Sequence, residues 1–207
     1  MNKDIVLIAG GNSLLGEKIS EQYISKNYMV VIISRNRNSI SNDKIYLKHD
    51  LSDILTLDHI NANIPNFSNR IKIIIHAVGG YKITSNILEA NNYYFDKFVL
   101  SYYNLILELK NIIKKNNGII IYLSSQILEN INFNNFAYSS TKHQGEIITK
   151  IIAKEFHGTL AQAINIRLNQ FTYPKDNAKT DSKIAKISND IRKLTEATYN
   201  NGCTVIL

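Results

Sequence analysis

Residues 5–16 read Ile5-Val-Leu-Ile-Ala-Gly-Gly-Asn-Ser-Leu-Leu-Gly16, and this short run already indicates the architecture of the chain. The apolar run Ile5–Ala9 is typical of a strand that is buried on both faces of a parallel sheet. Gly10 can make a tight turn after this strand, and Gly16 allows the following helix to pack closely against it. We therefore expect a strand, a glycine-rich turn and a helix over Leu15–Lys26, which together open a βαβ unit.

The same alternation continues to the end of the chain. Near-continuous apolar runs recur, and segments with the spacing of amphipathic helices separate them. The alternation of strands and helices indicates βαβ crossovers, a parallel sheet and helices on both of its faces. We therefore predict a Rossmann-like, doubly wound α/β fold with a mainly parallel, seven-stranded sheet, in a single domain over residues 1–207. The expected strands are Ile5–Ala9, Met29–Ser34, Ile45–Leu47, Ile71–Ala77, Gly118–Leu123, Ala163–Leu168 and Thr204–Leu207, and the expected helices are Leu15–Lys26, Asp53–Asn61, Tyr94–Asn116, Ala137–Phe156 and Ser182–Tyr199.

The composition fits a globular domain and argues against several classes of protein. Of the 207 residues, 44% are hydrophobic, which is enough for a full core. The net charge is +7, but the lysines are scattered, so we expect no nucleic-acid partner. No apolar run approaches the ~20 residues of a membrane-spanning helix, and the N-terminus lacks a signal-peptide pattern, which predicts a cytoplasmic protein without a membrane partner. Cys203 is the single cysteine and no cluster has metal-ligand spacing, so neither an intrachain disulfide nor a metal is expected.

The turn after the first strand is a candidate site for a pyrophosphate. A helix N-terminus presents free N–H groups and a partial positive charge, and both favour a bound anion. A glycine-rich turn that follows a buried strand and opens a helix is the context in which dinucleotides bind. A merely structural turn is the alternative. The residues expected to contact the cofactor here are Gly10, Asn12, Ser13, Leu14 and Leu15.

The end of the second strand bears on which dinucleotide binds. A cofactor with a free ribose 2′-hydroxyl usually meets an acidic side chain at this place. The chain instead has Ser34-Arg35-Asn36-Arg37, and no carboxylate follows before Asp43. Guanidinium groups suit a 2′-phosphate through planar, charge-assisted hydrogen bonds. We therefore predict NADP(H) over NAD(H), with Arg35 and Asn36 at the phosphate; if the arginines are only solvated loop charges, the preference stays open.

A serine, a tyrosine and a lysine form the candidate catalytic group. Ser125 lies at the end of the fifth expected strand, and Tyr138 and Lys142 share one face of the next long helix, at positions i and i+4. A phenol ionises near pH ~10, and a neighbouring ammonium favours the ionised form. The Ser125 hydroxyl can donate a hydrogen bond to a carbonyl oxygen that becomes anionic as hydride arrives. Alone, the Tyr-x-x-x-Lys spacing is common in structural helices. In a chain that also has the serine at a strand end and the glycine-rich turn, the spacing indicates proton transfer.

These motifs resemble the short-chain dehydrogenase/reductase family along essentially the whole chain. The turn Gly10–Gly16 is similar to the family's glycine-rich loop, and the pair Asp50-Leu51 is similar to the acidic and apolar residues that hold the adenine. The run Ala77-Val78-Gly79 lies where the family has an Asn-Ala-Gly strand end. The resemblance adds these five residues to the expected cofactor site.

The resemblance also implies a role for each candidate catalytic residue. Tyr138 would be the general acid in reduction and the general base in oxidation. Lys142 would hold the nicotinamide ribose and lower the pKa of the tyrosine, while Ser125 would orient the substrate oxygen. Tyr138 and Lys142 therefore count as cofactor-binding residues as well as catalytic ones.

The chain departs from the family pattern at several places. Leu14 replaces the middle glycine of the loop. The asparagine of the family's long central helix falls on Tyr102, or after a small shift on Asn104. The Pro-Gly pair after the sixth strand is Asn169-Gln170, followed by Phe171 where backbone contacts to the nicotinamide amide are expected.

The resulting hypothesis is an NADPH-dependent oxidoreductase that transfers hydride between the nicotinamide and a carbonyl or hydroxyl carbon of a small molecule. Residues 172–183 are expected to act as a substrate loop, with a plain surface connection as the alternative. A catalytically weak NADP-binding sensor or regulatory protein is a second hypothesis, which Leu14, Tyr102 and the end of the chain at Leu207 favour. Epimerase or dehydratase chemistry on a nucleotide-linked sugar is a third, which suits a short chain less well.

The aromatic residues near the start of the central helix allow two interpretations. In the resembled family this helix commonly pairs with its counterpart in a second subunit, which predicts a homodimer. Ordinary packing against the sheet is the alternative. His76, at the end of the fourth strand, is expected to be a hydrogen-bonded strand-end residue and not a ligand. The aromatic residues are Tyr93, Tyr94, Phe95, Phe98, Tyr102 and Tyr103.

Overall fold

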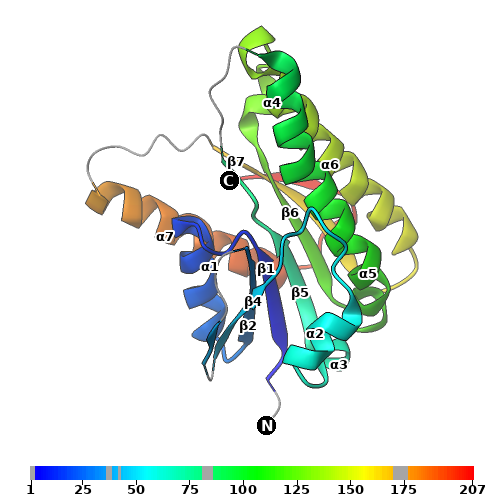
Figure 1. Ribbon diagram of the computed structural model, residues 1–207. Coiled ribbons are helices and arrows are strands. Elements are labelled where there is room, and N and C mark those ends of the chain that lie inside the picture. Colours follow the sequence, from blue (N-terminus) through cyan, green and yellow to red (C-terminus); the bar gives the residue numbers. More distant parts are fainter. Residues whose placement is uncertain (1–2, 36–38, 42, 81–85, 170–176) are drawn as a thin grey trace.

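The computed structural model describes residues 3–35, 39–41, 43–80, 86–169 and 177–207. In these residues the strands form one sheet in the order β3-β4-β2-β1-β5-β6-β7-β8, and helices cover both of its faces (Figure 1). The strands are β1 (Ile5–Ala9), β2 (Met29–Ser34), β3 (Ser39–Ile40), β4 (Lys44–Lys48), β5 (Ile71–His76), β6 (Ile119–Ser125), β7 (Gln162–Leu168) and β8 (Thr204–Ile206). The helices are α1 (Leu14–Ile24), α2 (Leu57–Asn63), α3 (Phe67–Arg70), α4 (Ile87–Tyr94), the π-helix η1 (Phe95–Leu100), α5 (Ser101–Lys115), the short η2 (Gln126–Glu129) and η3 (Phe133–Asn135), α6 (Phe136–Glu155) and α7 (Asn177–Thr195).

The predicted parallel sheet is confirmed. All strand pairs in the described part of the chain are parallel except β3 with β4. The two-residue strand β3 was not predicted, because it carries no apolar run of its own. The chain builds β2 and β4 on one side of β1 and then returns to place β5 on the other side. Open α/β sheets bind ligands at the carboxyl ends of the strands where the order reverses in this way.

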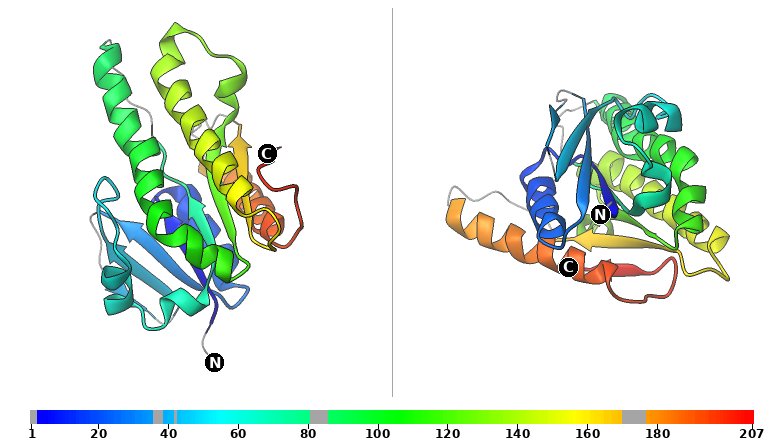
Figure 2. Two further views of the ribbon diagram at one scale, coloured as in Figure 1. Left: turned by 90° about the vertical axis from the view of Figure 1, so that its right-hand side faces the viewer. Right: turned by 90° about the horizontal axis from the view of Figure 1, so that it is seen from below.

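Alternate residues of the strands face two different hydrophobic layers. On β1, Ile5, Leu7 and Ala9 pack with the layer formed by α2, α3, α5 and α6, whereas Val6 and Ile8 pack with α1 and α7. All of them are fully buried, which explains the near-continuous apolar runs. Figure 2 shows α5 and α6 side by side on one face of the sheet.

The central helix is longer than predicted and is not regular. The expected helix over Tyr94–Asn116 begins instead at Ile87, where the side chain of Asn86 accepts hydrogen bonds from the helix N-terminus. Residues Phe95–Leu100 then form a π-helix between α4 and α5. A π turn is wider than an α turn, so it shifts which positions face the sheet on its two sides.

The last helix begins at Asn177, earlier than the predicted Ser182. Residues 177–183 of the expected substrate loop are therefore helical, and residues 172–176 lie outside the described part of the chain. The helix ends at Thr195, where the prediction was Tyr199. Helix ends depend on caps and tertiary contacts, which a periodic pattern does not report.

Candidate active site

A cavity of about 1100 Å³ lies along the carboxyl ends of β1, β5 and β6, where the strand order reverses. Its volume is large for a ligand pocket and suits an elongated ligand. The side chain of Leu14 is 39% exposed and does not line it, so its contact with a cofactor stays a prediction. Asn36 and Phe171 lie outside the described residues. The predicted residues that the fold brings together here are Gly10, Asn12, Ser13, Leu15, Arg35, Asp50, Leu51, Ala77, Val78, Gly79, Ser125, Tyr138 and Lys142.

The turn after β1 requires glycine at two positions. Gly10 has a φ of +81°, and a Cβ there would lie 2.8 Å from backbone atoms of Ala77 and Val78. A Cβ on Gly16 would lie 2.5 Å from the Cα of Gly11. The tight turn and the close packing of helix on strand are therefore both present, and they bring the N-terminus of α1 to the cavity.

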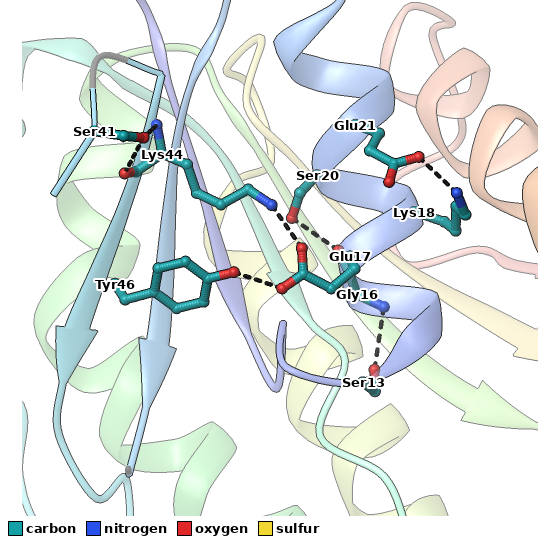
Figure 3. A network of polar contacts seen from close by, with 9 residues as sticks. All are labelled: Ser13, Gly16, Glu17, Lys18, Ser20, Glu21, Ser41, Lys44 and Tyr46. Carbon is teal, nitrogen blue, oxygen red and sulfur yellow. Dashed lines mark hydrogen bonds and ion pairs between the residues drawn. The ribbon is translucent and has the colours of Figure 1, made fainter. Parts of the chain in front are cut away.

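Two side chains hold the first turn of α1 in place: Ser13, just before the helix, and Glu17, within its first turn (Figure 3). Ser13 caps the helix, and its Oγ accepts a hydrogen bond from the N–H of Gly16 at 3.1 Å. Glu17 pairs with Lys44 of β4 at 2.6 Å and accepts a hydrogen bond from Tyr46 of the same strand. The Glu17 carboxylate is thus balanced by a lysine, so it opposes a bound anion less than a free carboxylate would.

The segment after β4 forms the wall opposite the turn. Asp50 accepts hydrogen bonds from the N–H and the hydroxyl of Ser52, both at 3.0 Å. The hydrogen bond from the Ser52 backbone is the main cause that holds the pKa of Asp50 below its ordinary value. Asn104 of α5 donates to the carbonyl oxygens of Leu51 at 2.9 Å and Ser52 at 3.0 Å. Asn104 therefore holds this segment in place and does not face the cavity.

Ser125 and Tyr138 form a hydrogen-bonded pair between the end of β6 and the first turn of α6. The Tyr138 ring packs edge-on against Tyr94 and Phe98, with ring centroids 5.4 Å apart in both cases. Burial raises the pKa of Tyr138 above its ordinary value, and the hydrogen bond with Ser125 offsets part of this increase. The phenol is therefore protonated at neutral pH and oriented by the serine, as a general acid requires.

Lys142 lies one helical turn after Tyr138 and is almost fully buried. Its Nζ donates hydrogen bonds to the carbonyl oxygens of Leu123 at 2.9 Å and Val78 at 3.2 Å. Burial, followed by the nearby charge of Lys97, lowers the pKa of Lys142 to about 7. Burial of the phenol dominates the pKa of Tyr138, and the Lys142 ammonium contacts backbone carbonyls. The expectation that Lys142 lowers the pKa of Tyr138 stays a prediction.

The lowered pKa of Lys142 makes the stability of the protein depend on pH. Between about 7 and the ordinary lysine value of 10.5, the unfolded chain holds a proton at this side chain that the folded chain has released. The free energy of unfolding therefore rises with pH across this interval. We expect urea unfolding to show this rise in the wild type and a flatter profile in Lys142→Met. Equal slopes in the two proteins would contradict a buried lysine that deprotonates near pH 7.

The central helix presents Ser101 to the cavity, whereas Tyr102 and Asn104, the two positions matched to the family asparagine, do not line it. The Tyr102 side chain is fully buried, and its hydroxyl hydrogen-bonds with Thr149 of α6 at 3.0 Å. The π turn before Ser101 causes this shift, and ordinary helical spacing in the sequence gives no signal for it. The same segment supplies three further cavity residues that were not predicted, Tyr93, Asp96 and Lys97.

His76 is a hydrogen-bonded strand-end residue, as predicted. Its side chain is fully buried, and its Nε2 lies 2.9 Å from the hydroxyl oxygen of Ser101. The Ser101 hydroxyl donates to the carbonyl oxygen of Lys97, so the histidine nitrogen is the donor in the first contact. Burial, followed by the charge of Lys142, lowers the pKa of His76 well below its ordinary value, so the ring is neutral. His76 therefore anchors the π-helix to β5.

The sequence profile of the family described as short chain dehydrogenase matches residues 4–174 of the chain. The chain belongs to the short-chain dehydrogenase family. No curated protein matches it in a sequence comparison. The predicted family and the predicted enzyme class, an NAD(P)-dependent oxidoreductase, are confirmed at the level of the family.

Solved structures share the fold of this short-chain dehydrogenase at low sequence identity. A short-chain dehydrogenase from Leptospira borgpetersenii with bound NAD+ has a TM-score of 0.82 and 17% identity, over 100% of this chain and 91% of that one. ElxO with NADP bound has a TM-score of 0.81 and 19% identity, over 99% and 96%. The ligand-free aldohexose dehydrogenase of Thermoplasma acidophilum has a TM-score of 0.79 and 17% identity, over 100% and 92%. At this identity the likeness establishes the fold.

The cavity of this short-chain dehydrogenase fits a nicotinamide dinucleotide. The glycine turn leaves the N-terminus of α1 open to a pyrophosphate, and the Ser125, Tyr138 and Lys142 side chains lie in the same cavity. Among the residues that the structure describes, no three His, Cys, Asp or Glu side chains gather in a way that could hold a metal ion.

Proposed function

We propose that this short-chain dehydrogenase uses NADP(H) to interconvert a carbonyl group and the corresponding alcohol in a small molecule. The main support is that Ser125, Tyr138 and Lys142 line the same cavity as the turn at Gly10. The dinucleotide, when bound, supplies or accepts the hydride. A protein that only bound the cofactor would not need a phenol and a serine hydroxyl in contact beside a buried lysine.

In this proposal Tyr138 transfers the proton. Because burial raises its pKa, the phenol is protonated at neutral pH and can give its proton to an oxygen that becomes anionic. Ser125 donates a hydrogen bond to the same oxygen and thereby orients the carbonyl group. In the direction of oxidation the tyrosine takes the proton from the alcohol. Lys142 lies one turn further along α6, where it would hold the nicotinamide ribose.

We propose that Arg35 selects NADP(H) over NAD(H). Arg35 follows β2, is exposed and lines the cavity. Arg35→Leu removes a charge-assisted hydrogen bond to the 2′-phosphate, worth about 1.5–3 kcal/mol, so KM for NADPH should rise about 10- to 100-fold. KM for NADH should stay the same, since that cofactor has no phosphate there. Steady-state kinetics with both cofactors measures this, and a preference of the wild type for NADH of about tenfold or more would refute the assignment.

The reaction itself is tested by NADPH oxidation across a panel of aldehydes and ketones. We expect turnover with at least one chemical class of carbonyl compound. Tight NADPH binding without turnover on a broad panel would instead support the sensor hypothesis. The exposed side chain of Leu14, in place of a loop glycine, is compatible with either outcome.

The proposal includes a homodimer formed through α5 and α6. The two helices lie side by side on one face of the sheet (Figure 2). Each exposes two large apolar side chains four residues apart, Tyr103 and Leu107 on α5 and Ile147 and Ile151 on α6. Neighbouring exposed apolar side chains of this kind are typical of protein interfaces.

A cytoplasmic location remains a prediction, as does the lack of a nucleic-acid partner. No helix in the described part of the chain is long and apolar enough to cross a membrane. Cys203 is a free thiol, which is compatible with a reducing compartment.

A further inference from the structure

A lysine of the π-helix lies at the reaction end of the cavity. Lys97 is partly buried and lines the cavity together with Ser125 and Tyr138. Its Nζ donates a hydrogen bond to the hydroxyl of Tyr93 at 2.8 Å and lies 5.0 Å from the centroid of that ring. A Cβ on Gly80 would lie 2.6 Å from the same Nζ. The ammonium therefore lies against the backbone of Gly80, in the segment that follows β5.

Lys97 makes no ion pair with a carboxylate in the part of the chain that the structure describes. Asp96 precedes it and also lines the cavity, but the two make no ion pair in the described part of the chain. An ammonium group has three donors, and the contact with Tyr93 uses one of them. A partly desolvated cation with free donors favours an anionic partner.

A second cation strengthens this preference. Lys97 lies close enough to Lys142 to contribute to the lowered pKa of that group. The two side chains therefore lie near each other in the cavity that Tyr138 also lines. An anion bound beside them would reduce their mutual repulsion.

We propose that Lys97 binds a carboxylate group of the substrate, so that the enzyme acts on small oxo acids and hydroxy acids. The carboxylate would accept a hydrogen bond from the Lys97 ammonium while the carbonyl oxygen meets Ser125 and Tyr138. This inference rests on the proposed function, since it names the substrate class of the same site. It makes Lys97 a residue that determines specificity.

The test compares unbranched oxo acids of increasing length with their methyl esters, which lack the negative charge. In the wild type we expect kcat/KM for the best acid to exceed that for its ester. In Lys97→Met the ratio of acid to ester should fall at least about tenfold, the size of one lost charge-assisted hydrogen bond. Lys97→Arg keeps the charge and should retain most of the ratio. Lys115→Met, at an exposed position at the end of α5, is the control for net charge.

An unchanged ratio of acid to ester in Lys97→Met would overturn the proposal. If the ratio is unchanged and the affinity for NADPH falls, the lysine binds the cofactor instead. A second measurement does not depend on turnover. Calorimetry with the NADP+ complex should show that butanoate binds the wild type more tightly than the neutral butanamide does, and that Lys97→Met loses this difference. If no carbonyl compound is reduced, the proposed function fails. The butanoate measurement still tests the carboxylate site, because equal affinities of the wild type for butanoate and butanamide would overturn that site.

Discussion

Replacing Tyr138 by phenylalanine is expected to lower kcat for NADPH-linked carbonyl reduction by about 100- to 10,000-fold, the usual contribution of a positioned general acid. The substitution removes one hydroxyl and leaves the ring. The ring makes the edge-on contacts with Tyr94 and Phe98, so the packing of α6 should persist. KM for NADPH should change far less than kcat, because the phenol acts on the substrate oxygen.

A matched substitution separates this effect from the general loss of a tyrosine hydroxyl. Tyr199→Phe removes the same group from a partly buried side chain after α7, outside the cavity, and should leave kcat unchanged. Thermal unfolding of both variants should stay close to that of the wild type. If Tyr138→Phe keeps the turnover of the wild type, Tyr138 takes no part in the mechanism. This conclusion holds whether the protein prefers NADPH or NADH.

The second large effect concerns stability. Arg167 of β7 and Glu146 of α6 form two hydrogen bonds of 2.8 Å each, and the Glu146 side chain is fully buried. Burial alone would raise the pKa of Glu146, but the contacts with Arg167, together with smaller effects of Ser124 and His143, hold the pKa below the ordinary value. Arg167→Met leaves a buried carboxylate without its partner, so we expect the free energy of unfolding to fall by about 3–5 kcal/mol.

Denaturant unfolding measures this loss, and two further variants test its cause. Lys110→Met breaks an ion pair with Glu155 whose side chains are 26% and 43% exposed, and it should cost only about 0–1 kcal/mol. The double variant Glu146→Leu with Arg167→Met removes both charges of the pair and should recover most of the lost stability. A loss in Arg167→Met as small as that in Lys110→Met would contradict the assignment.

This ion pair also affects the site. Glu146 lies one helical turn after Lys142, so the contact with Arg167 ties helix α6 to β7 next to the cavity. Glu146 also raises the pKa of Lys142, against the lowering effect of burial. Nothing in the local pattern of the sequence pairs Glu146 with Arg167, because they lie on different elements and far apart in the chain.

The sheet and the glycine turn follow from local features of the sequence. The runs Ile5–Ala9 and Met29–Ser34 form strands with the predicted bounds, because strands buried on both faces must be apolar throughout. Gly10 was predicted from the need for a tight turn, and its φ of +81° shows that need. Ser125, Tyr138 and Lys142 were predicted from their spacing along a strand end and a helix, and the structure brings them to one cavity.

Only the tertiary structure decided which side chains complete the reaction end of the cavity. The π turn over Phe95–Leu100 brings Lys97 and Ser101 to the cavity and turns Tyr102 into the core. The pKa of Lys142 likewise depends on burial beneath strands and helices that are distant in sequence. The physical reason is the same in both cases: periodicity reports the local helix or strand, whereas burial, charge and helix phase depend on how separate elements pack together.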